Sequence, residues 1–203
     1  EATGEEKPFF EYHMYTLPRP ATIADNEIKQ VSMFDPARAA VQKEYQYQAE
    51  PGQTSVTVFI KTTNSKEVGL GMPLPAGRVR LFKADSDGAM ILLGEDRIKH
   101  TPRNEEVKLT VGNAFDIVGK TLTVAQRRIT DQVIEPDFSI EVRNQKDKPA
   151  TVKVTKNLGA YWEIVKTSLD YVKKSASEVE WTVDIPAEGK ATERWAKALA
   201  LED

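Results

Sequence analysis

Residues 179–185 read Val-Glu-Trp-Thr-Val-Asp-Ile, in which apolar and polar side chains alternate without a break. Successive side chains of a β-strand point to opposite faces, so this segment makes a strand with an apolar face, which carries Trp181, and a polar face. The same alternation recurs at residues 56–61, 107–111 and 138–143. Strands with one buried face are typical of antiparallel sheets, because strands of parallel sheets read as continuous apolar runs. The sequence therefore predicts an all-β protein.

Turn sequences separate the alternating segments at short intervals, for example at residues 144–149. Many short strands joined by such turns predict an antiparallel β-sandwich. A change in composition at residues 130–136 divides the expected sandwich into two parts. These are a larger antiparallel β region at residues 9–133 and an immunoglobulin-like β region at residues 134–195, packed with the first as one unit.

The C-terminal region allows more specific predictions. Residues 137–144 and 151–155 read as the two strands of a hairpin joined by a short polar connection. Trp162, Ile164 and Trp181 are expected to fill the core behind this hairpin.

The two ends of the chain lack the strand pattern. Residues 1–8 are largely charged and predict a mobile tail. In residues 192–203, Trp195 and Leu199 have helical spacing, which predicts a short helix. Residues 196–203 are expected to be an added tail without a functional role.

Composition excludes several classes of protein. With 40% hydrophobic and 29% charged residues and a net charge of −3, the 203-residue chain is neither disordered nor basic enough for nucleic-acid binding. The absence of cysteine removes thiol catalysis, cysteine zinc sites and disulfides. No segment approaches the roughly 18 consecutive apolar residues of a membrane span.

The least sheet-like segment is Gly-Leu-Gly-Met-Pro-Leu-Pro-Ala-Gly at residues 69–77. Apolar side chains on a loop stiffened by proline can form a preorganised contact surface, so Leu70, Met72 and Leu74 are candidate binding residues for a partner or ligand. The alternative is a crossover between strands whose apolar side chains cap the sandwich core.

Asp85 and Asp87 are the candidate metal ligands. The two carboxylates lie two positions apart and precede Gly88, which resembles the start of a calcium-binding loop. Asp-Gly is also the strongest signal for a hairpin turn, so the sequence predicts a turn here and leaves a weak Ca²⁺ site as a second hypothesis. No other cofactor is expected.

The chain has two histidines, each near carboxylates, and neither is in a nucleophilic triad motif. The two clusters are His13 with Glu11 and Tyr15 on one strand face, and His100 with Glu95 and Asp96. Both can be interpreted as ordinary surface groups whose neighbours hydrogen-bond each other. The sequence therefore predicts no catalytic residue and a protein that is not an enzyme.

Four ordered motifs together resemble a known family. They are residues 10–26, 69–77, 85–88 and 94–102, and they are similar to a bacterial C-terminal domain of unknown function that occurs in proteins labelled mucoidy inhibitors. The resemblance implies the β-rich C-terminal part of a larger exported envelope protein, periplasmic or extracellular. It also implies that the partner is the protein's own N-terminal domain or another envelope protein, and it supplies no catalytic residues.

One departure from the family pattern is at the end of the chain. The family leads us to expect a closing alternating strand, whereas residues 193–199 read Glu-Arg-Trp-Ala-Lys-Ala-Leu, so the last strand is expected to be truncated or replaced.

Three functional hypotheses follow. The leading one is a non-enzymatic interaction module that works through strand edges and residues 69–77. A carbohydrate-binding sandwich is the second, since Tyr45, Tyr47 and Tyr161 are aromatic rings that can stack on sugars if they are exposed. A hydrolase that uses His100 and the nearby carboxylates is the third.

Overall fold

The computed structural model describes residues 6–17, 20–32, 34, 36–130, 133–159 and 162–200. It is nearly all β, with 62% of the residues in strands and 2% in helix, so the predicted fold class is confirmed. In this described part of the chain no helix is long and apolar enough to cross a membrane.

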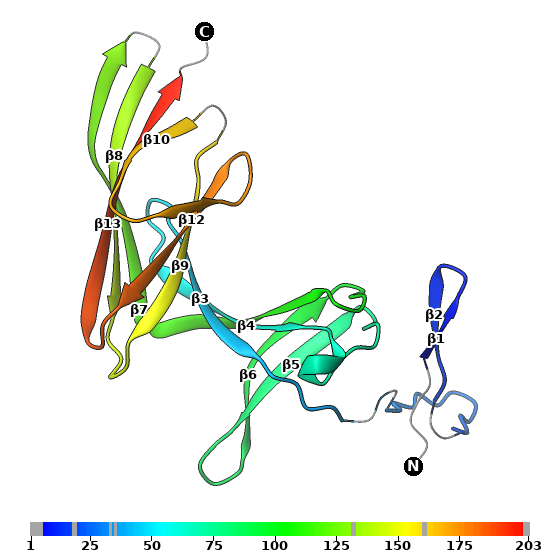
Figure 1. Ribbon diagram of the computed structural model, residues 1–203. Helices are drawn as coiled ribbons and strands as arrows, with labels where there is room; N and C mark the ends of the chain where they lie inside the picture. The colour runs from blue at the N-terminus through cyan, green and yellow to red at the C-terminus, as the bar shows by residue number, and fades with distance from the viewer. Residues whose placement is uncertain are drawn as a thin grey trace. The chain divides into compact units, whose positions relative to one another are not determined.

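The elements follow one another in this order along the chain (Figure 1). They are β1 (Glu6–Phe9), β2 (Tyr12–Tyr15), β3 (Gln42–Gln48), β4 (Ser55–Thr63), the 3-10 helix η1 (Lys66–Val68), β5 (Gly77–Ala84), β6 (Met90–Ile98), β7 (Glu106–Thr130), β8 (Val133–Asn144), β9 (Ala150–Asn157), β10 (Trp162–Thr167), β11 (Tyr171–Lys173), β12 (Glu178–Ile185) and β13 (Gly189–Ala200).

The chain divides into two compact units, each built from several segments. Unit 1 consists of Glu1–Gln42, Lys61–Arg80 and Glu95–Leu109, and unit 2 consists of Lys43–Ile60, Leu81–Gly94 and Thr110–Asp203. The division therefore differs from the predicted one.

The predicted boundary between residues 133 and 134 falls inside a paired hairpin. Strands β7 and β8 are antiparallel partners from Ile117↔Asn144 to Thr130↔Val133, so both sides of that boundary belong to one sheet. The predicted N-terminal tail is wrong for residues 6–8, because β1 begins at Glu6 and pairs with β2; residues 1–5 lie outside the described residues.

The large sheet has nine strands in the order β10-β13-β8-β7-β4-β3-β9-β12-β11. The sheet is mixed, because β3 runs parallel to β9, with Tyr45 opposite Val152. The prediction of purely antiparallel sheets is therefore corrected at this pair. A parallel neighbour needs a long connection in the chain, and residues 49–149 separate these two strands.

Unit 2 has the two layers of a sandwich, formed as the sheet folds back on itself (Figure 1). Strands β12 and β13 are not neighbours in the sheet, yet the rings of Trp181 and Trp195 lie 5.4 Å apart. Phe138 on β8 stacks on Trp195 with ring centroids 4.4 Å apart. The aromatic side chains thus join β8 and β13 to the layer that contains β12.

The core of unit 2 is apolar and contains Trp181, as predicted. Trp162 and Ile164, also predicted to fill the core, pack against it and are only partly buried. The buried members are Tyr45, Tyr47, Ala49, Val56, Ile117, Ile140, Val142, Val152, Val154, Leu158, Val179, Trp181, Val183, Ile185 and Trp195.

The predicted hairpin of residues 137–144 and 151–155 is wrong, although both strands exist as β8 and β9. Strand β8 pairs with β7 and β13, whereas β9 pairs with β3 and β12. The connection at residues 145–149 is therefore an arch between strands that are not partners. Asn144 stabilises it, because its buried side chain donates to the carbonyls of Lys148 and Pro186, at 2.8 and 3.0 Å.

The predicted C-terminal helix is also wrong, because a strand occupies this part of the chain up to Ala200. Residues 189–200 form β13, which pairs with both β8 and β10. A spacing of four, as between Trp195 and Leu199, fits a strand as well as a helix, because four is a multiple of the strand period of two. Pairing with neighbours on both sides selects the strand.

Candidate binding site in unit 1

The segment at residues 64–76 forms the centre of the candidate site, and its glycines allow close backbone approach. Gly69 ends η1 with a φ of 94°, a left-handed conformation that favours glycine. A Cβ atom on Gly69 would overlap the carbonyl oxygen of Arg38. The loop can therefore approach the segment around residue 38 only because this residue is glycine.

The buried side chain of Asn64 holds the loop in place. Its Nδ2 donates to the carbonyls of Met72 at 2.7 Å, Pro102 at 2.9 Å and Thr101 at 3.3 Å. Its Oδ1 accepts from the backbone N–H of Gly71 at 3.0 Å. One amide thus joins two segments that are distant in the sequence. The local sequence does not indicate this role of Asn64, since an asparagine after a strand signals only a turn.

The first cavity of unit 1 is largely apolar and has a volume of about 550 Å³. It brings the predicted residues Leu70, Met72 and Leu74 together in one lining, with Phe34 and Ala37 completing the apolar wall. The three predicted side chains are half-buried, and none of them belongs to the core cluster of unit 2. The alternative interpretation, that they cap the sandwich core, is therefore wrong.

Charged groups also line this cavity. The carboxylate of Glu6 is only 4% exposed; one oxygen lies 2.6 Å from Nδ1 of His13 and the other accepts from Arg103 at 3.1 Å. A buried carboxylate is costly without such partners, and here two nitrogen groups compensate it. Lys66 also lines the cavity and is exposed. The site thus combines an apolar wall with basic side chains.

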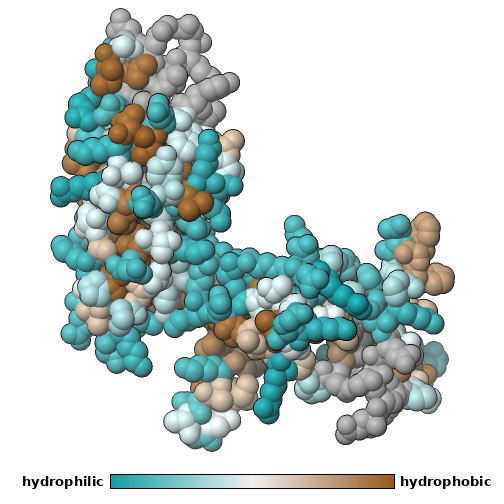
Figure 2. All heavy atoms as spheres, in the orientation of Figure 1, coloured by the Kyte–Doolittle hydropathy of each residue, from teal (hydrophilic) through white to brown (hydrophobic). Residues whose placement is uncertain are grey.

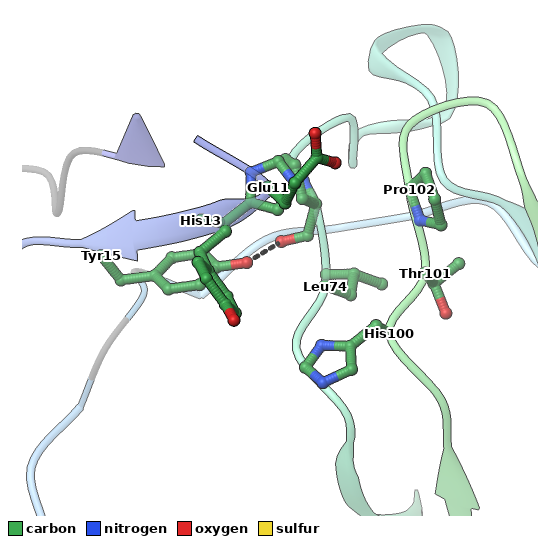
Figure 3. A pocket seen from close by; sticks show the side chains of 9 residues that line it. Glu11, His13, Tyr15, Leu74, His100, Thr101 and Pro102 are labelled. Carbon is green, nitrogen blue, oxygen red and sulfur yellow. Dashed lines mark hydrogen bonds between the residues drawn. The ribbon is translucent and has the colours of Figure 1, made fainter. Parts of the chain in front are cut away.

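A second cavity of about 460 Å³ contains both histidines of the chain (Figure 3). His13 comes from β2, whereas His100 follows β6, and Leu74 lines this cavity as well as the first one. The sequence predicts two separate histidine clusters, because nothing local to either residue indicates that their segments meet.

Glu11, His13 and Tyr15, predicted to share one strand face, do line the same cavity. His13 and Tyr15, however, form their hydrogen bonds with other residues. His13 pairs with Glu6, and the Tyr15 hydroxyl donates to the carbonyl of Pro73 at 2.9 Å (Figure 3). Burial, and secondarily the charge of Glu6, raises the pKa of Tyr15. These contacts hold the β1–β2 hairpin against the loop.

The groups near His100 also have partners of their own. Nδ1 of His100 accepts from the backbone N–H of Ala76 at 3.2 Å. Glu95 pairs with Arg80 at 3.0 Å and Arg78 at 3.2 Å, and the hydrogen bond from Arg80 lowers the pKa of Glu95 although desolvation opposes it. Asp96 accepts from the backbone N–H of Arg97. These contacts match the interpretation of the cluster as surface groups with hydrogen-bonded neighbours, and the absence of a catalytic role stays a prediction.

Asp85 and Asp87 lie in the turn between β5 and β6, as predicted. An oxygen of Asp85 accepts from the N–H of Ser86 at 2.7 Å, one of Asp87 accepts from Ala89 at 2.9 Å, and Gly88 has a φ of 87°. The hairpin turn is thereby confirmed. Where the structure describes side chains, it shows no group of three or more acids and histidines able to hold a metal ion. Calcium binding at the two aspartates stays a prediction.

The predicted sugar-stacking role is wrong for two of its three tyrosines. Tyr45 and Tyr47 are 7% and 0% exposed in the core of unit 2, so neither ring is available to a sugar. The Tyr47 hydroxyl donates to the carbonyl of Gln53 at 2.7 Å and lies 2.9 Å from the hydroxyl of Thr121. Tyr161 lies outside the described residues.

Comparison of the chain with protein-family models, curated proteins and solved structures gives no match. The resemblance to the bacterial envelope domain therefore stays a prediction, and the functional argument rests on the geometry of unit 1.

Proposed function

We propose that this protein is a non-enzymatic binding module whose site is the apolar cavity of unit 1. One observation carries the proposal: Leu70, Met72 and Leu74, predicted from the sequence as one contact surface, line a single cavity of about 550 Å³. Ligand sites are typically concave, mostly apolar and largely preformed, with a few polar groups that orient the ligand.

The hydrogen bonds of Asn64 support a preformed site. They hold the carbonyls and N–H groups of the loop in one arrangement, so little conformational entropy is lost when a ligand enters. The ligand that fits this lining is an apolar segment of a protein chain with an acidic group beside it, because Lys66 lies at the cavity.

The family resemblance gives this module a biological setting. We propose that the chain is the C-terminal part of an exported bacterial envelope protein. Its partner would then be the N-terminal domain of the same protein or another envelope protein, in the periplasm or outside the cell.

An anionic apolar dye, anilinonaphthalene sulfonate, tests the site without knowledge of the natural ligand. We expect its fluorescence to rise with the parent protein and to fall several-fold with Met72→Glu, because a carboxylate in the apolar wall repels the dye. Met90→Glu is the matched control, since Met90 is 64% exposed on β6 and does not line the cavity. Equal dye binding by the two variants, each checked for native circular dichroism, would contradict the proposal.

A further inference from the structure

The β1–β2 hairpin presents its apolar face to solvent. Alternation places Glu6, His13 and Tyr15 on the face that contacts the rest of unit 1, through the bonds to Arg103 and Pro73 described above. The opposite face carries Phe9 opposite Tyr12, and Lys7 opposite Met14. These side chains are exposed, although Tyr12 also lines the second cavity, so the usual arrangement of a half-buried sheet is reversed.

The free end of this hairpin is the most aromatic exposed surface of unit 1. Phe9, Phe10 and Tyr12 are 65%, 89% and 72% exposed. Figure 2 shows the hydrophobic colour at the tip of this hairpin. A cluster of exposed aromatic side chains marks an interaction site, because burying such rings contributes strongly to association.

The turn itself is unfavourable for folding. Phe10 has a φ of 57°, a left-handed conformation in which a bulky residue is an outlier and glycine or asparagine is usual. The ring of Phe10 is 89% exposed, so its burial within the chain does not compensate the unfavourable backbone conformation. Residues kept in a strained conformation at an exposed tip are typical of functional sites.

We propose that this aromatic tip docks in the apolar cavity of a second copy of the chain. The inference rests on the proposed function and names the partner of that site. The cavity of about 550 Å³ is large enough for aromatic side chains, and its lining of Leu70, Met72 and Leu74 matches their apolar character. The tip is convex and the cavity concave, so the contact joins different surfaces of the two copies.

Charge complementarity favours this occupant. Glu11 follows Phe10 at the exposed turn, whereas the cavity carries the exposed Lys66. When the ring of Phe10 enters the cavity, the carboxylate of Glu11 can pair with Lys66. Such pairs at the rim of an interface fix orientation and raise the rate of association.

Self-association measured by sedimentation velocity and light scattering tests the inference. We expect the parent to form species above the monomer mass of 22.7 kDa in a concentration-dependent manner. We expect the tip variant Phe9→Ser/Phe10→Ser and the cavity variant Met72→Glu each to associate roughly 100-fold more weakly, because aromatic anchors dominate interfaces. Ile28→Ser is the control, since Ile28 is fully exposed in unit 1 and outside both surfaces, and it should associate like the parent.

Mixing the two defective variants gives the sharpest result. The tip variant keeps an intact cavity and the cavity variant keeps an intact tip, so a mixture should form heterodimers that neither variant forms alone. A parent that is monomeric at about 1 mM, the weak end of the affinity range, would overturn the inference. So would tip and cavity variants that associate as the parent does.

Dye binding and vesicle binding distinguish a second copy of the chain from a different occupant of the cavity or the tip. If Met72→Glu weakens dye binding but the parent protein stays monomeric, only the inference about a second copy fails. If Met72→Glu leaves dye binding unchanged and the parent is also monomeric, the proposed function fails as well. Tip-dependent binding to anionic phospholipid vesicles by a monomeric parent would identify a membrane as the occupant and overturn the inference.

Discussion

Units 1 and 2 are held together by different interactions. In unit 2 the buried side chains are mainly apolar and surround Trp181 and Trp195. In unit 1 the buried side chains include the polar Asn64 and Ser65, while Leu70 and Leu74 are half-buried around cavities. When hydrogen bonds hold a loop, its apolar side chains need not form a core and remain available for binding.

The largest expected effect is the loss of the central ring of unit 2. Trp181→Ala should lower the free energy of unfolding by about 3–5 kcal/mol, because it leaves a large cavity in a close-packed core. The change should appear in chemical denaturation and as faster hydrogen exchange in β8, β9, β12 and β13. Val124→Ala, at a position 64% exposed on β7, is the control and should change little. A similar loss from both substitutions would show that the Trp181 core does not dominate the stability of unit 2.

A smaller and more local effect is expected in unit 1. Asn64→Ala should cost about 1–3 kcal/mol, because it leaves carbonyls of the loop without their donor. Hydrogen exchange should quicken at residues 64–74 and 101–105 and stay unchanged in β12 and β13. Dye binding at the cavity should fall as well, since the loop loses its single arrangement.

Asn144→Ala is the matched variant in unit 2. Asn144 bonds the arch in the same way, but an apolar core holds the adjoining strands, so faster exchange should be confined to residues 145–149. If this variant opened β8 and β9, the contrast between the units would not hold.

Tyr47 places a titratable polar group inside the apolar unit. Burial raises the pKa of Tyr47 above its ordinary value of 10.0, so the fold favours the neutral phenol. Its contribution to stability is complete below about pH 10 and is lost as the pH rises through the raised pKa of the folded state. Denaturation of the parent should therefore become easier above pH 10.

Tyr47→Phe separates the two contributions of this residue. Near neutral pH it should cost about 1 kcal/mol, since the hydrogen bond to the carbonyl of Gln53 is lost. Above pH 10 the variant should lose stability less steeply than the parent. Parallel pH profiles would show that the pKa of Tyr47 is the same in the folded and unfolded states, and would contradict the raised value.

The smallest effect is expected at the turn between β5 and β6. Asp87→Asn should change stability by less than about 0.5 kcal/mol, because an asparagine oxygen can also accept from Ala89 and Asn-Gly suits the turn. If the predicted Ca²⁺ site exists, millimolar calcium should raise the melting temperature of the parent by ~2–4 °C and that of the variant by less. If calcium leaves the melting curve of the parent unchanged, residues 85–88 form a turn and not a Ca²⁺ site.

Much of unit 2 could be predicted because strand patterns are local. The alternation at residues 179–185 places Trp181 on the buried face of β12 whatever the partner strands are. The turn at Asp85 is likewise encoded in adjacent residues, because Asp-Gly favours it directly. The grouping of Leu70, Met72 and Leu74 followed from their apolar character on a stiff loop.

Pairing between distant strands could not be predicted in the same way. Residues 192–200 suit a strand or a helix by spacing, and only contact with β8 and β10 selects the strand. Tyr45 and Tyr47 have the same alternation whether their face is covered or exposed. Both rings are buried in a core whose other members come from strands distant in the chain, among them Val152 and Val154 of β9, about a hundred residues later.

The sequence by itself determined which segments become strands and turns, because period and turn chemistry act between neighbouring residues. Only the tertiary structure decided which strands face each other and which polar groups meet. The pairing of Glu6 with His13 and Arg103, and the bonds from Asn64 to the carbonyls of Met72 and Pro102, join segments that no local pattern relates. The cavity depends on tertiary structure as well, since Leu70, Met72 and Leu74 come from one loop but Phe34 and Ala37 come from a segment about thirty residues earlier in the chain.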